Sequence, residues 1–320
     1  MDLSPTIVTV FGGAGFIGTQ LVQQLARRGY RIRVAVRRPD LAGHVRPLGA
    51  VGQVMPIQAN IRNRDSVERA IRGAAIVINL VGIGNERGKQ RFRAVHTLGA
   101  KNVAEAARAL GVTQLVHVSA LGADPQSPST YARSKAFGET EVLVAYPGAV
   151  IIRPSIVFGP GDGFFNRYGM LARLLPVLPV IGGKSRFQPV YVGDVAEAIA
   201  RAAEGKVRTG RIYEIGGPEV ATHKQLVARV LADTGRNNPL LPLPAGLAKL
   251  MALPLAILPS PLITADQVDL LQTDNIVSEQ AQREKRTLAA FDITPTAMDA
   301  ILPSYLWRFM KNGQFDRQTA

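Results

Sequence analysis

The stretch from Thr6 to Arg38 reads TIVTVFGGAGFIGTQLVQQLARRGYRIRVAVRR, and it decides the fold. Thr6–Phe11 is a short apolar run rich in β-branched residues, which predicts a buried strand. Four glycines follow at once, and apolar residues then recur at helical spacing as far as Gly29. A second apolar run, Arg31–Val36, predicts the next strand. Strand, glycine turn, helix and strand form a βαβ unit, which is the context that a glycine fingerprint requires.

The glycines suit a turn that approaches a dinucleotide closely. Gly12, Gly15 and Gly18 read Gly-x-x-Gly-x-x-Gly, and Gly13 offers Gly-x-Gly-x-x-Gly with the last two. Glycine tolerates a positive φ and has no β-carbon, so the backbone can turn tightly beside a pyrophosphate. The amides that begin the next helix then point at the phosphates, whose charge the helix dipole favours. An ordinary tight turn is the alternative, but the βαβ context favours dinucleotide binding.

The residues after the second strand bear on which dinucleotide binds. An NAD site usually has an acidic residue here, which holds the ribose 2′-hydroxyl. This chain has Arg37 and Arg38 instead, and their forked donors match the oxygens of a phosphate. Strand ends are often exposed to solvent and charged without any ligand, which is the alternative. Two adjacent guanidinium groups nevertheless favour NADP(H) over NAD(H).

Composition excludes several classes of protein. Cysteine is absent, so disulfides and cysteine metal sites are excluded. No apolar run approaches the roughly 20 residues that a membrane-spanning helix needs. The net charge is +14, and residues 1–110 hold 17 Lys and Arg against 6 Asp and Glu. Such a positive field attracts phosphorylated ligands or anionic lipid. The alternative is a basic face that contacts only solvent. Binding of nucleic acid has no support, because the sequence contains no recognition motif for it.

The rest of the first half repeats the pattern of strand and helix. Apolar runs near 54–58, 75–80, 114–119 and 149–152 alternate with helical patterns near 64–72, 89–110 and 131–144. This alternation predicts an α/β fold with a doubly wound parallel Rossmann sheet. Ligands of such sheets bind beyond the carboxyl ends of the strands. The residues expected there are Gly12, Arg37, Asn60, Val81 and Ser119.

A second motif, Tyr131-Ala-Arg-Ser-Lys135, opens the helix that follows the fifth strand. Tyrosine and lysine four residues apart share one helix face. A nearby ammonium group lowers the tyrosine pKa toward the range useful for proton transfer. The same spacing is common by chance, but its place after the fifth strand of a dinucleotide-binding fold favours a functional pair. His96, in the preceding helical pattern, is expected to be a packed or hydrogen-bonded structural residue.

The second half of the chain is less regular. We place a boundary after residue 158, between a dinucleotide-binding Rossmann domain (1–158) and a smaller, mostly helical substrate or docking domain (159–320) with segments that return to the sheet. Asp194 with Glu197, and Thr222 with Gln225, predict helix N-caps and their reciprocal partners. Residues 239–263 hold six prolines and a single charge, so no continuous helix can cross a bilayer there.

These residues resemble the short-chain dehydrogenase/reductase superfamily, in its extended and atypical branch. Four motifs match in order and spacing: GGAGFIG (12–18), YARSK (131–135), RPSIVFGPGD (153–162) and FQPVYVGDVAEAI (187–199). Two tail motifs, DQVDLLQTDNIVS (266–278) and LPSYLWRFMKNGQF (302–315), are similar to one subgroup. That subgroup is the bacterial form of the NADPH-binding accessory subunits of the alpha subcomplex of respiratory complex I.

The resemblance implies a set of cofactor contacts, with the nicotinamide near Tyr131, Lys135 and the turn at 154–156. The expected contacts are Gly12, Gly15, Phe16, Ile17, Gly18, Arg37, Arg38, Asn60, Ile61, Leu80, Val81, Gly82, Ser119, Tyr131, Lys135, Pro154 and Ile156. One departure concerns catalysis, which would use Tyr131 and Lys135. Active members have a hydroxyl residue two positions after Ser119, and this chain has Leu121. Cofactor binding is therefore better supported than turnover.

Three functions remain open from the sequence. One is an NADPH-bound accessory subunit of complex I with little or no turnover, cytoplasmic and peripheral on the inner membrane. The resemblance implies docking near the junction with the membrane arm, through residues 239–320 and with lipid or quinone contact. The second is an active NADP-dependent reductase, epimerase or dehydratase acting on a sugar nucleotide or a quinone-like substrate. The third is a sensor that reports NADPH occupancy to a partner protein.

Overall fold

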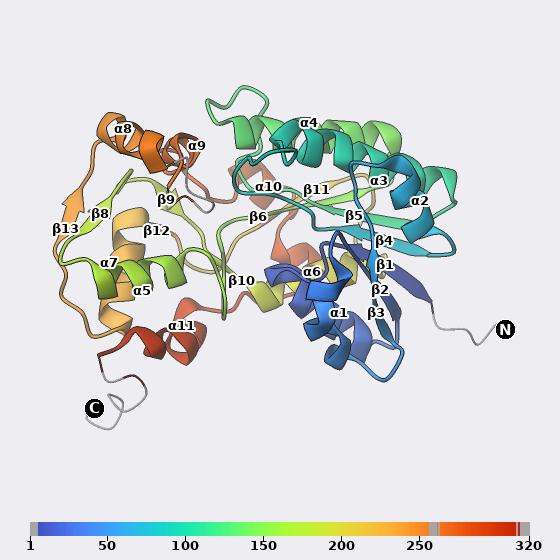
Figure 1. The fold of residues 1–320 in the computed structure, drawn as a ribbon, viewed down its shortest axis with the longest axis horizontal. Helices are drawn as coiled ribbons and strands as arrows, with labels where there is room; N and C mark the ends of the chain where they lie inside the picture. Colours follow the sequence, from blue (N-terminus) through green and yellow to red (C-terminus); the bar gives the residue numbers. More distant parts are fainter. Residues whose placement is uncertain (1–5, 256–260, 262, 312, 314–320) are drawn as a thin grey trace. The chain divides into compact units, whose positions relative to one another are not determined.

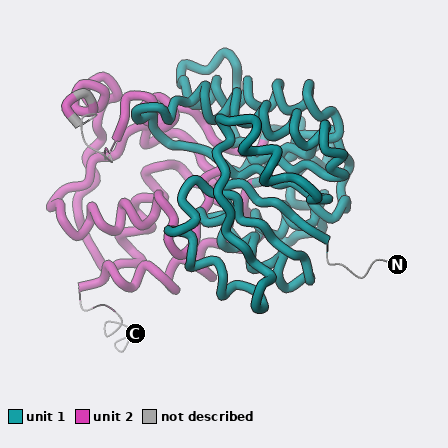
Figure 2. Tube along the Cα trace, turned by 45° about the vertical axis from the view of Figure 1, so that its right-hand side comes forward, with its two compact units in different colours: residues 1–154, 192–215, 278–294 teal, residues 155–191, 216–277, 295–320 magenta. Residues whose placement is uncertain are grey.

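A computed structural model describes residues 6–255, 261, 263–311 and 313. The chain forms two compact units and passes between them several times (Figure 2). The sheet unit comprises residues 1–154, 192–215 and 278–294, and the second unit comprises residues 155–191, 216–277 and 295–320. The first passage between the units lies close to the predicted boundary, and two later segments belong to the sheet unit.

The sheet unit is built on seven parallel strands, which confirms the predicted doubly wound sheet. Their order across the sheet is β11-β6-β5-β4-β1-β2-β3, with β4 at the centre and β1 beside it. The strands are β1 (Ile7–Phe11), β2 (Arg31–Val36), β3 (Val54–Gln58), β4 (Ile76–Asn79), β5 (Gln114–Val118), β6 (Val150–Pro154) and β11 (Ile212–Ile215). Six of them coincide with predicted runs, whereas β11 was not among those runs.

Helices cover both faces of this sheet (Figure 1). On one face α1 (Phe16–Arg27) packs beside α6 (Val192–Ala203). The other face carries α2 (Arg64–Ile71), α3 (Leu98–Ala109) and α4 (Thr130–Ala145). The core between them is apolar and fully buried, which fixes the strand ends that carry the candidate site. The remaining short segments of the unit are η1 (Pro39–Leu48), η2 (Arg93–Thr97), α10 (Glu279–Arg283) and η3 (Leu288–Phe291).

The structure corrects the predicted helix at 89–110. Regular α-helix begins only at Leu98, after one turn of π-helix, η2. Before it, the backbones of Arg87 and Gln90 are hydrogen-bonded to each other in both directions, so the chain reverses at Gly88 and Lys89. The turn is possible because Gly88 adopts a φ of +52°, which favours glycine.

The predicted N-cap at Asp194 is also wrong. Helix α6 already begins at Val192, so Asp194 lies within its first turn. Glu197 therefore does not act as a capping partner; its carboxylate pairs with Arg28 and Arg201 instead. The pair with Arg28, the C-cap of α1, connects α6 to α1, whereas the pair with Arg201 lies within α6.

The second unit is smaller and mostly helical, as predicted. Its elements are β7 (Val157–Phe158), α5 (Phe165–Leu174), β8 (Leu178–Val180), β9 (Arg186–Phe187), β10 (Val190–Tyr191), β12 (Ala221–Thr222), α7 (His223–Asp233), β13 (Leu240–Pro242), α8 (Ala245–Leu255), α9 (Ala265–Leu270), α11 (Met298–Leu306) and η4 (Trp307–Phe309). The capping box of Thr222 and Gln225 is confirmed at the start of α7. In the described part of the chain, no helix is long and apolar enough to cross a membrane.

Candidate dinucleotide site

A cleft of about 600 Å³ opens at the carboxyl ends of β1 to β4, where a doubly wound sheet binds its ligand. Its size lies within the range of small-molecule sites. Twelve of the predicted contacts line it: Gly12, Gly15, Phe16, Ile17, Gly18, Arg37, Arg38, Asn60, Ile61, Leu80, Val81 and Gly82. The fold therefore gathers the residues of four separate segments around one cavity.

The glycine turn has the shape that a pyrophosphate requires. Gly12 has a φ of +79°, and a β-carbon on Gly18 would lie 2.6 Å from the carbonyl oxygen of Gly12. Because these two residues have no side chains, the backbone of the turn packs directly against the backbone of α1. Gly15 is the N-cap of α1, and no side chain caps the helix there. The first amides of α1 are thus left for a phosphate, which fits a dinucleotide.

The part of the cleft that lies at the end of β2 is cationic. Arg38 is exposed and pairs with Asp40, with Nη2 2.9 Å from the carboxylate, and these hydrogen bonds hold the pKa of Asp40 below its usual range. Arg37 is also exposed, and within the described residues it has no ion pair. His44 lines the same wall, and its Nε2 lies 3.2 Å from the carbonyl oxygen of Ala14 in the glycine turn. Arg37 is therefore the guanidinium that is free to meet a phosphate here.

The cleft also includes residues that the sequence motifs do not predict. They are Phe11, Ala14, Ala35, Val36, Leu41, Ala42, His44, Ala59, Arg62, Ile83, Gln90 and Val95. Several are neighbours of motif residues on the same strand ends, and adjacency alone would have found them. His44 lies in the 3₁₀ segment η1 and Gln90 in the turn that follows β4, and no signal in the sequence places them at the cleft.

Tyr131 and Lys135 lie on the first turns of α4, where the Tyr131 ring packs edge-on against His96 and Lys135 adjoins the end of the cleft formed by Gly82. A β-carbon placed on Gly82 would be 3.4 Å from Lys135 Nζ, so the amine adjoins the cleft wall. Lys135 is 5% exposed, and its ammonium donates to the Val118 carbonyl at 3.2 Å. Burial lowers the pKa of Lys135 to about 8, although the negative charge of Glu139 opposes this shift. The ammonium form therefore predominates at neutral pH.

His96 connects the cleft wall to the helix that carries Tyr131. The Ile83 amide donates to His96 Nε2 at 2.9 Å, which leaves the ring proton on Nδ1, 2.8 Å from Ser134 Oγ. The Ser134 hydroxyl donates in turn to the Tyr131 carbonyl at 2.7 Å. Burial, with the nearby charge of Lys135, lowers the pKa of His96 to about 2, so the ring stays neutral. His96 is thus the hydrogen-bonded structural residue that we predicted, within the π-helical turn η2.

The catalytic hydroxyl position remains apolar in the structure. Leu121 is buried, and its amide donates to the Pro154 carbonyl at 2.9 Å. Thr130 Oγ1 accepts a hydrogen bond from Arg133, so it already has a partner. Ser119 is 4% exposed, and its hydroxyl has no hydrogen-bond partner among the described residues. A buried polar atom of this kind is costly unless a ligand satisfies it.

The last two predicted contacts are not brought to the cleft by the sheet unit. Pro154 ends β6 and does not line the cavity, and Ile156 belongs to the second unit. Ser119, Tyr131 and Lys135 likewise lie outside the lining. The contacts of all seventeen residues with a cofactor stay predictions.

Comparison with known proteins agrees with this geometry. Residues 8–216 match the NAD dependent epimerase/dehydratase family. The mitochondrial NADH dehydrogenase [ubiquinone] 1 alpha subcomplex subunit 9 of Arabidopsis thaliana is 37% identical over 98% of this chain and 80% of its own length. A ceramide reductase of Caulobacter vibrioides is 37% identical over 59% of this chain and 58% of that protein.

Solved structures share the fold. The UDP-glucose 4-epimerase of Thermus thermophilus in complex with NAD has a TM-score of 0.67 and 24% identity. The alignment covers 98% of this chain and all of the epimerase chain. At this identity the likeness supports the fold, and that fold binds a nicotinamide dinucleotide in the epimerase.

Proposed function

The chain belongs to the NAD dependent epimerase/dehydratase family, and on that premise we propose that it is an NADP(H)-binding accessory subunit of respiratory complex I. The observation that carries the proposal is the near full-length match to an alpha subcomplex subunit of an NADH dehydrogenase [ubiquinone]. The subunit would serve structure or assembly, with little or no turnover of its own. Isolation of complex I from the native host, with this chain tagged, tests the assignment by mass spectrometry of the copurifying proteins.

The bound cofactor in this proposal is NADP(H) rather than NAD(H). The glycine turn and the first amides of α1 would hold the pyrophosphate, and Arg37 would meet the 2′-phosphate. Lys135 would hold the ribose of the nicotinamide, since its ammonium adjoins Gly82. When bound, the cofactor supplies a hydride donor or acceptor. The family match and the fold support nicotinamide dinucleotide binding in general, and Arg37 supports the phosphorylated form.

An active NADP-dependent reductase is the second candidate. Tyr131 and Lys135 favour it, as does the partial match to a ceramide reductase. Against it stands Leu121, because a buried leucine cannot donate a hydrogen bond to a substrate carbonyl. Ser119 is the remaining hydroxyl with no partner among the described residues, so any turnover would depend on it.

Turnover distinguishes the two candidates. We expect the purified protein with NADPH to reduce a broad panel of carbonyls and quinones very slowly, because the second hydroxyl donor is missing. Tyr131→Phe should leave NADPH affinity largely intact, whereas Lys135→Ala should weaken it through the lost ribose contact. Absorbance at 340 nm and calorimetric titration measure the two quantities. Rapid turnover that disappears in Tyr131→Phe would establish the reductase instead.

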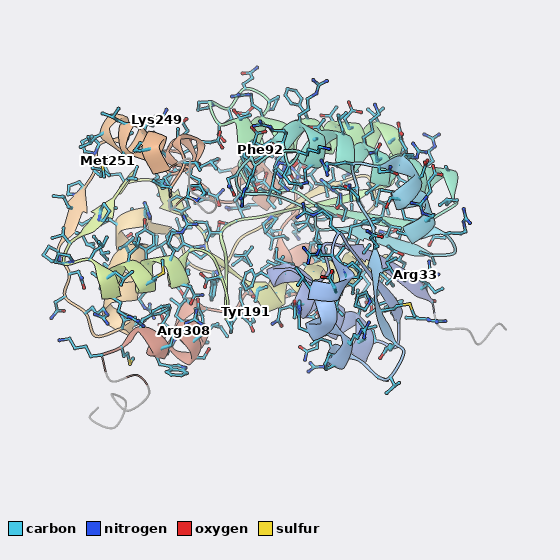
Figure 3. The ribbon with its side chains drawn as sticks, in the orientation of Figure 1. Arg33, Phe92, Tyr191, Lys249, Met251 and Arg308 are labelled. Carbon is cyan, nitrogen blue, oxygen red and sulfur yellow. The ribbon has the colours of Figure 1, made fainter. Side chains whose placement is uncertain are left out.

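The proposed docking surface lies on the second unit and combines three neighbouring segments. Helix α8 exposes Leu247, Leu250 and Met251, which share one face by their spacing (Figure 3). The end of α5 and its link to β8 expose Leu174, Leu175 and Val177. Strand β13, which pairs with β8, exposes Leu241. Residues 170–181 and 239–255 contain no acidic side chain. Their cations are Arg173 and Lys249, of which Lys249 pairs with Asp269 of α9 at 2.6 Å. An exposed apolar surface whose own segments carry no acidic side chain suits the interface of a membrane.

The described residues near the C-terminus contribute little to this surface, although the predicted docking region, 239–320, includes them. Tyr305 and Leu306 are buried in the core of the second unit, and the Tyr305 hydroxyl donates to Asp162. Leu302 is buried as well, so a deletion from residue 302 would damage the core rather than test docking. Residues 256–260, 262, 312 and 314–320 of the predicted docking region lie outside the described residues.

Substitutions on α8 give the sharper test. We expect Leu247→Glu with Leu250→Glu to move the protein from the membrane fraction of its native host to the soluble fraction. The reason is that both side chains are exposed, so the charges remove apolar contact without entering a core. Val51→Glu with Val144→Glu, at exposed positions of the sheet unit, is the matched control and should stay with the membrane. NADPH binding should survive in both variants.

Two results would contradict the docking proposal. One is an α8 variant that remains membrane-bound as firmly as the control. The other is a wild-type protein that is wholly soluble in its host and copurifies with no respiratory-chain subunit. We propose the cytoplasmic face of the inner membrane as its location, and protease protection in vesicles of known orientation tests the face.

A further inference from the structure

The end of the loop between β4 and η2, with the first residue of η2, forms an ordered hairpin, residues 84–93, which we call the basic hairpin. Arg87 and Gln90 are hydrogen-bonded through their backbones in both directions, each at 2.9 Å. The Glu86 carboxylate accepts from the Phe92 amide at 2.7 Å and from Arg91 at 3.3 Å. These bonds close the base of the hairpin and fix its tip.

The basic hairpin presents positive charge at its tip and at its C-terminal end that the fold does not use. Arg87, Lys89 and Arg93 are exposed, and within the described residues none of them has an ion pair. Arg91 alone is paired, with Glu86, which is the single acidic residue of the ten. Three like charges lie within residues 87–93 of the chain and repel one another, so the arrangement costs free energy in the isolated protein. An acidic surface that covers them would remove that cost.

The chemistry of the hairpin favours a protein surface over a lipid surface. A lipid-binding segment places apolar or aromatic side chains beside its cations. The basic hairpin exposes none, since its single large apolar residue, Phe92, is 5% exposed (Figure 3). Helix α8, in contrast, exposes leucines. The apolar face of α8 therefore suits a membrane, whereas the basic hairpin suits an acidic protein surface.

The basic hairpin is also tied to the dinucleotide cleft. Gln90 lines the cleft, and Arg62, which lines it as well, donates from Nη1 to the Lys89 carbonyl at 2.8 Å. Arg62 Nε donates to Asn60 Oδ1 at 3.3 Å, at the end of β3. A ligand in the cleft therefore packs against the same residues that hold the hairpin tip in place.

We propose that the basic hairpin binds an acidic surface of a neighbouring protein subunit, and that this binding is linked to occupancy of the dinucleotide cleft. The inference rests on the proposed function, because the neighbour is a subunit of the respiratory assembly. Linkage is reciprocal: if the loaded cleft strengthens hairpin docking, docking strengthens dinucleotide binding by the same factor.

Rebinding to membranes tests the proposal. Membranes come from the native host with the gene for this chain deleted, and the purified full-length protein is added back loaded with NADPH. The variant carries Arg87→Glu, Lys89→Glu and Arg93→Glu, and leaves the supporting Glu86–Arg91 pair intact. The control carries Arg27→Glu, Arg31→Glu and Arg69→Glu, exposed cations of the same unit that do not line the cleft. Both variants change the net charge equally.

We expect the hairpin variant to rebind at least about tenfold more weakly than the control, because it places like charges against an acidic surface. Nucleotide-free wild-type protein should rebind more weakly than the loaded protein. A hairpin variant that rebinds like the control overturns the docking, and equal rebinding with and without NADPH overturns the linkage. Wild-type protein that fails to rebind at all overturns the proposed function together with the inference. A last measurement uses protein-free vesicles of phosphatidylcholine and phosphatidylglycerol. If the hairpin variant loses as much binding to these vesicles as to the host membranes, the hairpin binds lipid, and the proposal of a protein partner is wrong.

Discussion

Replacing Arg37 by alanine is expected to weaken NADPH binding about tenfold to a hundredfold, since a hydrogen bond to a charged group contributes roughly 1.5–3 kcal/mol. NADH lacks the 2′-phosphate and should bind the variant nearly as well as the wild type. Arg38→Ala should cost less, because Arg38 already shares its guanidinium with Asp40. The double variant should show the full loss that the sequence predicts for Arg37 and Arg38 together. Calorimetric or fluorescence titration of the wild type and the three variants with both nucleotides measures these affinities.

Arg46→Ala is the matched control for this experiment. Arg46 is an exposed arginine of η1, the segment that follows Arg38, and it does not line the cleft. Its removal lowers the general positive field without removing a phosphate contact, so both nucleotides should be affected slightly and alike. If Arg37→Ala weakens NADPH and NADH equally, Arg37 contacts a group that both share, and the preference for NADP(H) loses its basis.

The strands of the sheet were predictable because each is a short run of apolar, mostly β-branched residues between turn signals. The exception, β11, shows the limit of this reasoning. Its sequence, IYEI, places Glu214 in a buried strand, which no pattern of hydrophobicity favours. The structure satisfies that carboxylate with Arg153, at 3.6 Å, and with the Ser278 amide, at 2.8 Å. Both partners are distant in sequence, so the compensation is visible only in three dimensions.

The residues of the candidate site likewise divide into those that the sequence predicts and those that it does not. Residues of the glycine turn and of strand ends were predictable, because their positions follow from the sheet order alone. His44 and Gln90 reach the cleft because a 3₁₀ segment and a hairpin fold back toward it. Such returns depend on a few long-range hydrogen bonds, here those of His44 to Ala14 and of Arg62 to Lys89. The sequence shows the residues but not these contacts.

Lys135 should make the stability of the nucleotide-free protein depend on pH in an alkaline window. Burial lowers the pKa of Lys135 from 10.5 to about 8. Below pH 8 the folded and unfolded states both carry the proton, and the folded state bears the full cost of a buried charge. Between pH 8 and 10.5 the folded state has lost the proton while the unfolded state keeps it. The unfolded state then binds more protons, so the free energy of unfolding rises with pH.

The pKa difference of about 2.5 corresponds to a total of about 3 kcal/mol, at about 1.4 kcal/mol for each pKa unit. Several tyrosines with raised pKa values oppose the effect above pH 10, so the comparison must be made against variants. Lys135→Met removes the titrating group. From pH 7.5 to 10 we expect the free energy of unfolding of the wild type to rise relative to that of the variant. Lys101→Met is the control, since the pKa of the half-exposed Lys101 is raised by its hydrogen bond to Glu141. Urea unfolding at each pH gives the values. If wild type and Lys135→Met change in parallel across this window, the Lys135 amine keeps its ordinary pKa in the folded protein, and its proposed position as a buried ammonium beside the cleft is wrong.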